Sequence, residues 1–321
     1  MTDTAAIPHR RLGASDLRIA PLVLGGNVFG WTADRATSFA VLDAFVDHSG
    51  TMIDTADVYS AWVTGHSGGE SETVIGEWLK TSRKRDKVLI ATKVGMLPGE
   101  GGEKLAPARI VAACDASLRR LGTDRIDLYF AHQDDEAQPQ DAVAEAFATL
   151  VAAGKVRVLG ASNFHAARLK SAVETARAAG LPHYQVLQPE YNLVSRHKFE
   201  GELQDYCVVE NIGVVPYYGL ASGFLTGKYR SREDLGKSVR GGRIGDLLEG
   251  KGAAMLAAMD AVAQESGATL AQIALAWLAA QPGVTAPIAS ATSVAQLEEL
   301  MGTMTLTLVD AQLARLTDAG A

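Results

Sequence analysis

The sequence predicts an α/β fold in which eight parallel strands close into a (β/α)8 barrel. Strand-like runs alternate with helix-like stretches along the chain, which is typical of βαβ units and a parallel sheet. Eight such units in 321 residues match the usual size of this barrel. No linker rich in Pro, Ser or charge interrupts the pattern, so we expect one domain over residues 1–321.

The elements follow from local pattern. We expect an N-terminal β-hairpin, and then strands where short apolar runs rich in β-branched residues end at turn residues. The expected strands are 19–26, 51–57, 87–94, 126–133, 156–163, 184–192, 213–219 and 285–290. Apolar residues at three and four spacing predict helices at 36–49, 71–80, 107–121, 141–154, 165–179, 197–211, 269–281 and 294–302. Pro107 suits a first helical position, and Gly122 suits a helix end.

A doubly wound open sheet is the competing architecture. Such a fold usually carries a G-x-G-x-x-G phosphate-binding turn after its first strand. Here residues 24–30 read LGGNVFG and lack that pattern. The closed barrel is therefore the better prediction.

One segment, residues 220–251, is rich in glycine and charge and forms the expected long loop after strand seven. Loops of this length inside a compact domain are usually functional or mobile. Its cations could either grip a small anionic ligand or simply be solvated. They are Lys228, Arg230, Arg232, Lys237, Arg240 and Arg243.

Composition limits the functional classes. The net charge of −7 and the pI near 5.5 argue against a broad nucleic-acid-binding surface. The N-terminus lacks a secretory signal pattern, and no apolar run is long enough to span a membrane. Cys114 and Cys207 have neither metal-site nor redox-pair spacing. We therefore expect a cytoplasmic protein that binds neither nucleic acid nor membrane.

Four residues that could share a proton-transfer task lie at or just past the ends of separate expected strands. They are Asp54, Tyr59, Lys93 and His132. An ammonium beside a phenol favours the phenolate, and a carboxylate can hold that ammonium charged and in place. The imidazole can donate a hydrogen bond to an oxygen in the cleft. Such a group could protonate a carbonyl oxygen, and the reverse transfer would oxidise an alcohol.

Each of the four also has an ordinary structural interpretation. Asp54 could cap a turn, Tyr59 could be a half-buried aromatic, and His132 could be a satisfied loop residue. Lys93 is harder to explain this way, because lysine is seldom buried without a partner. Their joint occurrence on consecutive strand ends favours the catalytic interpretation.

The chain resembles the aldo-keto reductase superfamily over nearly its whole length, most closely the branch of aryl-alcohol-dehydrogenase-like reductases and potassium-channel β subunits. The similar segments include RRLGASDLRIAPLVLGG at 10–26, TMIDTADVYS at 51–60, GESETVIGEWL at 69–79 and LIATKVG at 89–95. Further along they are DLYFAHQDD at 127–135, GKVRVLGASNF at 154–164, QPEYNLVSR at 188–196 and LASGFLTGKY at 220–229.

The resemblance implies a nicotinamide dinucleotide, NADPH or NADP⁺ with NADH as an option, bound at the barrel mouth without a Rossmann domain. It makes Tyr59 the general acid/base, tuned by Lys93 and Asp54, with His132 orienting a carbonyl. The cofactor-binding residues it implies are Gly26, Asn27, Asp54, Ser162, Asn163, Gln188, Tyr217, Gly219, Leu220, Ser222, Lys228, Arg240, Thr292, Gln296 and Glu299. Several of these, including Ser162 and Asn163, could instead cap a helix or be polar residues at the core edge.

Departures from the family pattern concern the 2′-phosphate, the adenine contacts and the loop after the stacking aromatic. Many members carry Lys or Arg after the last strand to bind the 2′-phosphate of NADP, but residues 290–296 read SATSVAQ. Gln296 and Arg240 would have to serve instead. Ser290 and Leu300 replace the usual Gly and Asn, and Tyr218–Gly219 replaces Ser-Pro. The choice between NADP and NAD therefore stays open.

The expected substrate pocket is apolar and aromatic. Its candidate wall residues are Phe29, Trp31, Trp62 and Met96, of which both tryptophans could equally be packing residues. Such a mouth would suit an aryl or medium-chain aldehyde or ketone. The sequence fixes neither the physiological substrate nor the oligomeric state.

Three functional classes are open to a barrel of this kind. The favoured one is an NADP(H)-dependent oxidoreductase that reversibly reduces an aldehyde or ketone to an alcohol. The alternative is a regulatory or partner-binding protein that holds the cofactor with little turnover. A metal-dependent barrel hydrolase needs several His and Asp residues on the rim, where only His132 is well placed, so no metal site is expected.

Overall fold

Eight parallel strands form the centre of the protein in the computed structural model, which describes residues 7–237, 244–248 and 250–320. They are β3 (Val23–Gly25), β4 (Met52–Asp54), β5 (Leu89–Val94), β6 (Ile126–Ala131), β7 (Val156–Ser162), β8 (Tyr184–Gln188), β9 (Gly213–Val214) and β10 (Ile288–Ala289). Neighbours in space run β10-β3-β4-β5-β6-β7-β8-β9. Apart from the position of β10, this is the order of the chain, as expected for repeated βα units.

The sheet closes on itself between β9 and the segment that leads into β10. Val214 forms a parallel bridge with Val284, and the Thr285 amide donates to the Val214 carbonyl at 2.8 Å. The Ile288 amide donates to the Pro216 carbonyl at 2.9 Å. Since β10 also pairs with β3, the predicted (β/α)8 barrel is confirmed.

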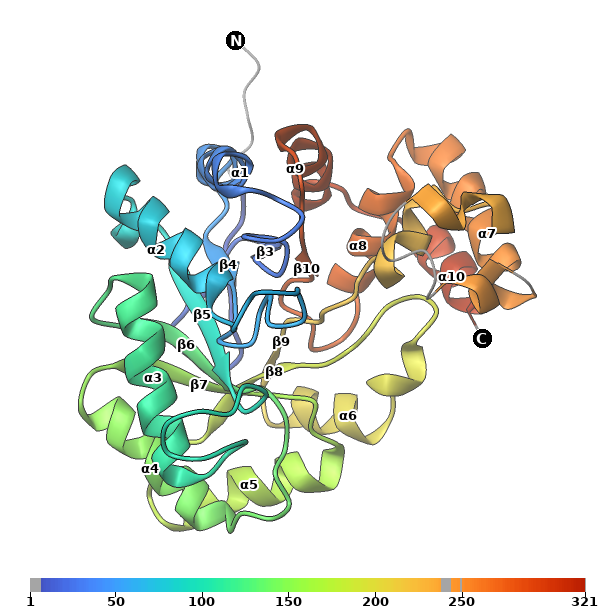
Figure 1. Cartoon of the computed structure of the whole chain (residues 1–321). Helices are drawn as coiled ribbons and strands as arrows, with labels where there is room; N and C mark the ends of the chain where they lie inside the picture. The colour runs from blue at the N-terminus through green and yellow to red at the C-terminus, as the bar shows by residue number, and fades with distance from the viewer. Residues whose placement is uncertain (1–6, 238–243, 249, 321) are drawn as a thin grey trace.

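Helices lie around the outside of the strands, as Figure 1 shows. They are α1 (Arg35–Asp47), α2 (Glu70–Ser82), α3 (Pro107–Leu121), α4 (Gln140–Ala152), α5 (Ala166–Ala178), α6 (Glu202–Val209), α7 (Lys251–Ser266), α8 (Leu270–Ala279), α9 (Val294–Met301) and α10 (Asp310–Ala319). As predicted, α3 begins at Pro107, and its C-cap Gly122 is left-handed with φ 61°. None of the described helices is both long and apolar enough to cross a bilayer.

The predicted N-terminal hairpin is also present. It consists of β1 (Arg10–Arg11) and β2 (Arg18–Ile19), which pair antiparallel. Its apolar side chains Leu12, Leu17 and Ile19 are buried in one cluster with the inward-facing side chains of the barrel. The hairpin therefore covers the end of the barrel away from the strand carboxyl ends, and full burial of each such side chain contributes about 1.5–3 kcal/mol.

Differences from the sequence prediction concern lengths and the C-terminal third. The strands are shorter than predicted, since several expected residues belong to the loops that follow them. Helices α7 and α10 were not predicted, and they pack against each other beside the barrel (Figure 1). The long loop after the seventh barrel strand is present, with the short 3-10 helices η3 (Ala221–Thr226), η4 (Arg232–Lys237) and η6 (Gly245–Leu248).

Candidate active site

A cavity of about 750 Å³ opens at the carboxyl ends of the barrel strands. This volume lies in the usual range for small-molecule and cofactor sites. The predicted site residues that line it are Asn27, Asp54, Tyr59, Trp62, Met96, His132, Ser162, Asn163, Gln188, Tyr217, Gly219, Leu220, Ser222, Lys228, Thr292, Gln296 and Glu299. Residues from all parts of the chain therefore meet at one end of the barrel, where such barrels carry their active sites.

A hydrogen-bonded group of three predicted catalytic residues lies at the cavity wall. Lys93 is fully buried, and its Nζ donates to Asp54 Oδ2 at 2.7 Å and to the Thr55 carbonyl at 2.7 Å. Its third contact is Tyr59 Oη at 2.9 Å, and the Tyr59 hydroxyl lies 3.3 Å from Asp54 Oδ2. Three acceptors around one ammonium satisfy all of its donors, so this buried charge is fully partnered.

Burial dominates the electrostatics of this group. It raises the pKa of Tyr59 well above 10, and the negative charge of Asp54 acts in the same direction. Burial lowers the pKa of Lys93, against the attraction of Asp54. The sequence interpretation stressed the ammonium as the factor that lowers the pKa of the phenol, but burial has the larger effect. At neutral pH Tyr59 is therefore a protonated donor.

His132 follows β6 directly and faces the same cavity. Its ring centroid lies 6.0 Å from that of Tyr59, and its backbone amide donates to the Val94 carbonyl at 2.7 Å. Burial, together with the positive charge of Lys93, lowers the pKa of His132 well below 6.5. The imidazole is therefore neutral at physiological pH and can act as a hydrogen-bond donor without being an acid.

Next to the four predicted catalytic residues, several polar side chains are joined to one another and to Asp54 by hydrogen bonds. Gln188 Nε2 donates to Asp54 Oδ1 at 2.9 Å, and the Ser162 hydroxyl donates to the Gln188 carbonyl at 2.8 Å. Asn163, left-handed with φ 58°, donates from Nδ2 to the His132 carbonyl at 2.8 Å. The Tyr217 hydroxyl donates to Asn163 Oδ1 at 2.7 Å. These contacts fix polar groups of β7 and β8 in the part of the cavity next to Tyr59.

The segment after Tyr217 has an unusual backbone. Tyr218, Ala221, Ser222 and Gly223 all have positive φ, and an added Cβ at Gly223 would lie 2.8 Å from the Cε of Lys228. Because left-handed residues are costly outside glycine, the surrounding structure must hold this turn in place. The turn lines the cavity and brings backbone groups and the Lys228 ammonium to it, which suits an anionic ligand.

The other end of the cavity is built around β10 and α9. Ser290 donates to Asn27 Oδ1 at 2.6 Å, and Gln296 Oε1 accepts from both the amide and the hydroxyl of Thr292 at 2.9 Å. Glu299 adds a carboxylate to this lining. The residues 290–300 thus offer hydroxyl, amide and carboxylate groups without a cation.

Four predicted site residues lie elsewhere. Phe29 is fully buried in the core, because the tight turn from Gly26 directs its ring away from the cavity. Gly26 is buried beside that ring, where an added Cβ would lie 3.3 Å from Phe29 Cδ2, and it does not line the cavity. Trp31 supports the wall indirectly, packing edge-to-face on Trp62 with ring centroids 5.5 Å apart. Arg240 lies outside the described residues.

The sequence interpretation also missed some lining residues. The main additions are Val28, Thr32, Thr226 and Lys237, while Tyr218 and Ser290 had been named only as departures from the family pattern. Lys237 was noted only as one of the loop cations; it is paired with Asp234 at 2.7 Å. Arg230, another of those cations, binds both carboxylate oxygens of Asp260 at 2.8 Å. The structure, not the sequence, therefore shows which of the described loop cations line the cavity.

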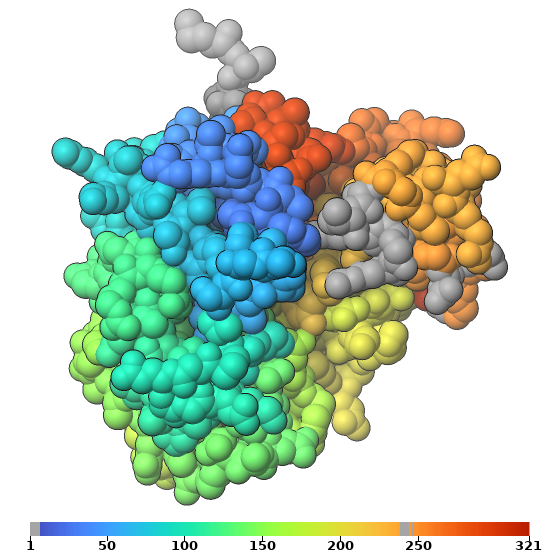
Figure 2. Space-filling model, viewed as in Figure 1, coloured from blue at the N-terminus to red at the C-terminus, as the bar shows by residue number. Residues whose placement is uncertain are grey.

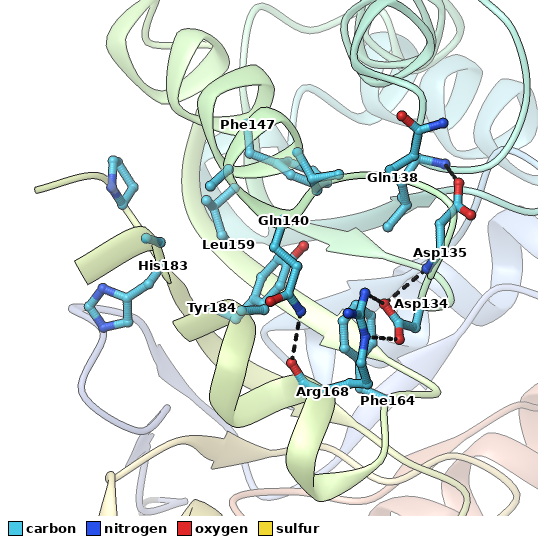
Figure 3. A pocket seen from close by; sticks show the side chains of 16 residues that line it. Asp134, Asp135, Gln138, Gln140, Phe147, Leu159, Phe164, Arg168, His183 and Tyr184 are labelled. Carbon is cyan, nitrogen blue, oxygen red and sulfur yellow. Dashed lines mark hydrogen bonds and ion pairs between the residues drawn. The ribbon is translucent and has the colours of Figure 1, made fainter. Parts of the chain in front are cut away.

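A second hollow lies between α4, α5 and the strands β7 and β8 (Figure 3). It encloses about 20 Å³, which is room for about one water molecule and too little for a substrate. At its edge Asp134 lies near Glu136 and His165, a group that could be read as a metal site. Arg168, however, binds both oxygens of Asp134 at 2.7 and 3.0 Å, so this carboxylate already has a cation partner.

Comparison with known proteins agrees with this geometry. The chain matches the aldo/keto reductase family model over residues 21–321. It belongs to the aldo/keto reductase family. The predicted resemblance is thereby confirmed, and the family generally uses nicotinamide cofactors.

Individual relatives match over nearly their full lengths. An uncharacterized oxidoreductase, YrpG, of Bacillus subtilis is 34% identical over 317 residues, covering 96% of this chain and 94% of the relative. A probable voltage-gated potassium channel subunit beta of Arabidopsis thaliana is 30% identical, covering 91% and 90%. The L-glyceraldehyde 3-phosphate reductase of Escherichia coli is 31% identical, covering 91% and 86%. Family and relatives together support an oxidoreductase that reduces carbonyl compounds.

Proposed function

We propose that this protein is an NADP(H)-dependent reductase that reversibly converts an aldehyde or ketone to an alcohol, with Tyr59 as the general acid/base. One observation carries the proposal. A phenol, a buried ammonium and a carboxylate are joined by hydrogen bonds of 2.7 to 3.3 Å at the wall of a cavity large enough for a nucleotide. This donor set suits proton transfer to a carbonyl oxygen.

The proton comes from Tyr59. Its raised pKa keeps the hydroxyl protonated at neutral pH, which is the form required for reduction. When Tyr59 gives up the proton, the phenolate that remains is 2.9 Å from the Lys93 ammonium, which stabilises it. Asp54 holds that ammonium charged in a buried position. In the oxidation direction the same phenolate takes a proton back from the alcohol.

His132 orients the carbonyl, and apolar side chains line the mouth of the cavity. His132, neutral and buried, lines the same cavity as Tyr59 and would donate a hydrogen bond to the carbonyl oxygen. Preorganised donors of this kind stabilise charge that develops on oxygen, and loss of one such donor typically costs about 10²- to 10³-fold in rate. Trp62, Met96 and Tyr218 provide apolar surface at the mouth, which suits an aryl or medium-chain carbonyl compound.

The residues present fit a nicotinamide nucleotide. A reduced nicotinamide, when bound, supplies the hydride for the carbonyl carbon. Ser162, Asn163 and Gln188 would hold its carboxamide, and the Tyr217 ring would lie under the nicotinamide. The turn that follows Gly219, with Ala221 and Ser222 left-handed, would hold the pyrophosphate together with Lys228. Thr292, Gln296 and Glu299 would face the adenosine, a set that also admits NADH because it lacks a cation.

Steady-state kinetics test this proposal. Wild-type protein should consume NADPH in the presence of an aromatic aldehyde panel, followed at the nicotinamide absorbance, and Tyr59→Phe should not. Fluorescence titration with NADPH and with NADH should show binding to both proteins, since the substitution removes only a hydroxyl. Equal turnover by wild type and Tyr59→Phe on every carbonyl would refute the assignment.

A further inference from the structure

Asp57 is a buried carboxylate that the catalytic group does not use. It follows Asp54 by three residues and precedes Tyr59 by two. Its side chain does not line the cavity, is fully buried, and places Oδ2 3.4 Å from Nη2 of Arg109. The backbone amide of Asp57 donates to the carbonyl of Lys93 at 3.3 Å. Asp57 therefore belongs to the loop that presents Tyr59, but it faces the protein interior.

Arg109 of α3 joins this loop to the next one. Its guanidinium is nearly fully buried and contacts the backbone of the segment after β5, with Nε 3.1 Å from the Leu97 carbonyl. Nη1 lies 3.3 Å from the Glu100 carbonyl. An added Cβ at Gly99 would lie 2.6 Å from Nη1, so the segment fits closely around the guanidinium. Figure 2 shows the two loops side by side, in light blue and teal, on one face of the molecule.

Each of the two loops carries a residue that faces the cavity. The loop after β4 carries Tyr59, and the loop after β5 carries Met96. The planar guanidinium can donate to a carboxylate and to two carbonyls in fixed directions at once, which a lysine ammonium cannot reproduce. Arg109 and Asp57 together thus connect the proton donor to the apolar wall of the substrate site.

Burial disfavours the charged form of Asp57 and so weakens the ion pair. Burial and the charge of Glu72 raise the pKa of Asp57 to about 7, although Arg109 and Arg120 act in the opposite direction. The charged and titratable groups that face Asp57 come from four neighbouring elements: Glu72 of α2, Arg109 and Arg120 of α3, Lys93 of β5 and Tyr129 of β6. A buried ion pair of this kind is weak evidence for stability, and its retention here fits a role in positioning.

We propose that Asp57 and Arg109 are positioning residues that fix the Tyr59 loop against the Met96 loop and thereby set the geometry of carbonyl reduction. This inference rests on the proposed function. Because neither side chain lines the cavity, their loss should lower kcat and leave the dissociation constant of the nucleotide unchanged. A displacement of about 1 Å at a reacting group can cost up to about 10²-fold in rate.

A double-mutant cycle tests the pair. Asp57→Asn and Arg109→Met should each lower kcat about tenfold or more, and the double variant should be no slower than the slower single variant. Arg109→Lys should give an intermediate kcat, since it keeps the charge without the fork. Arg119→Met, an exposed position on the same helix, is the matched control and should match wild type.

Hydrogen exchange measured by mass spectrometry gives a readout that does not depend on turnover. Both single variants should exchange faster in peptides covering 55–63 and 95–103, with no change in β7. Faster exchange in only one of the loops, additive losses of kcat, or kcat within about twofold of wild type would overturn the positioning role. If wild type itself turns over no carbonyl, the proposed function fails, while the exchange data still decide whether the pair joins the loops.

Discussion

Substitution of Lys93 should affect both the stability of the protein and its catalytic activity, and a second substitution can distinguish the two effects. Lys93→Met keeps most of the side-chain volume and deletes the donor to Asp54, the Thr55 carbonyl and Tyr59. Asp54 is then a buried carboxylate that retains Gln188 Nε2 but has lost its cation. Loss of one partner from a buried ion pair typically costs about 3–5 kcal/mol, so we expect a decrease of that size in the free energy of unfolding.

A double variant should regain stability without regaining activity. Asp54→Asn combined with Lys93→Met removes both charges and should recover at least half of the lost stability, because no uncompensated charge remains buried. It should stay inactive, since the phenolate of Tyr59 would still lack its ammonium. Recovered stability with no recovered turnover would show that the pair is kept for chemistry.

Urea unfolding followed by circular dichroism measures these differences, and NADPH consumption measures turnover. The m-value should be the same in all variants, so that midpoints can be compared directly. Arg125→Met, which breaks an ion pair with the exposed Asp86, is the control and should unfold close to wild type. A loss below about 1 kcal/mol for Lys93→Met, or a double variant less stable than the single one, would refute the reasoning.

Further predictions concern the same site. Tyr59→Phe should lower the reduction rate about 10²- to 10⁴-fold in steady-state assays and leave nucleotide affinity intact; weaker nucleotide binding would contradict this. Trp62→Ala should lower kcat/KM about tenfold for aryl aldehydes relative to short aliphatic ones, and an equal loss for both would argue against an aromatic wall. Between about pH 4 and about pH 7 folded Asp57 keeps a proton that the unfolded chain releases, so its contribution to the free energy of unfolding falls as the pH rises; in urea titrations the stability of Asp57→Asn relative to wild type should therefore increase with pH across this range. His132 contributes in the opposite direction, because below about pH 6.5 the unfolded residue binds a proton and the folded one does not; the stability of His132→Gln relative to wild type should therefore increase as the pH falls below that value.

Much of the site could be predicted because strand ends in a parallel barrel share one rim. Asp54 ends β4, Lys93 lies near the end of β5 and His132 follows β6, so their positions in the expected strands were enough to bring them to one end of the barrel. Lys93 was informative because a lysine inside an apolar strand needs a partner, and the structure supplies Asp54 as that partner. These predictions depended on strand position and residue type, whereas Gln188 at the end of β8 was implied only by the family resemblance.

Loop residues were less predictable because their direction depends on turns and tertiary contacts. Phe29 lies close in sequence to Asn27, which lines the cavity, yet a hydrogen bond from its amide to the Gly26 carbonyl turns its ring into the core. From the sequence alone Arg230 could bind an anionic ligand, but in the structure its guanidinium is paired with Asp260 of α7. Arg109 and Asp57 are 52 positions apart, and nothing in their local sequence indicates that they meet.

Helices α7 and α10 escaped the sequence interpretation for a related reason. In α7 alanines are spread around the helix, so the buried set of Met255, Leu256, Met259 and Val262 is poorly separated from the exposed face. Both helices pack beside the barrel and lie outside its regular βα alternation. Tertiary packing, not local periodicity, defines them.

Transfer of a labelled hydrogen tests the central claim most directly. Protein incubated with an aromatic aldehyde and NADPH deuterated at the reactive carbon of the nicotinamide should yield an alcohol with one deuterium on the carbinol carbon, detected by mass spectrometry. Tyr59→Phe should yield almost none in the same time. An alcohol without deuterium, or equal labelling by the two proteins, would contradict the proposed reduction and the assigned role of Tyr59.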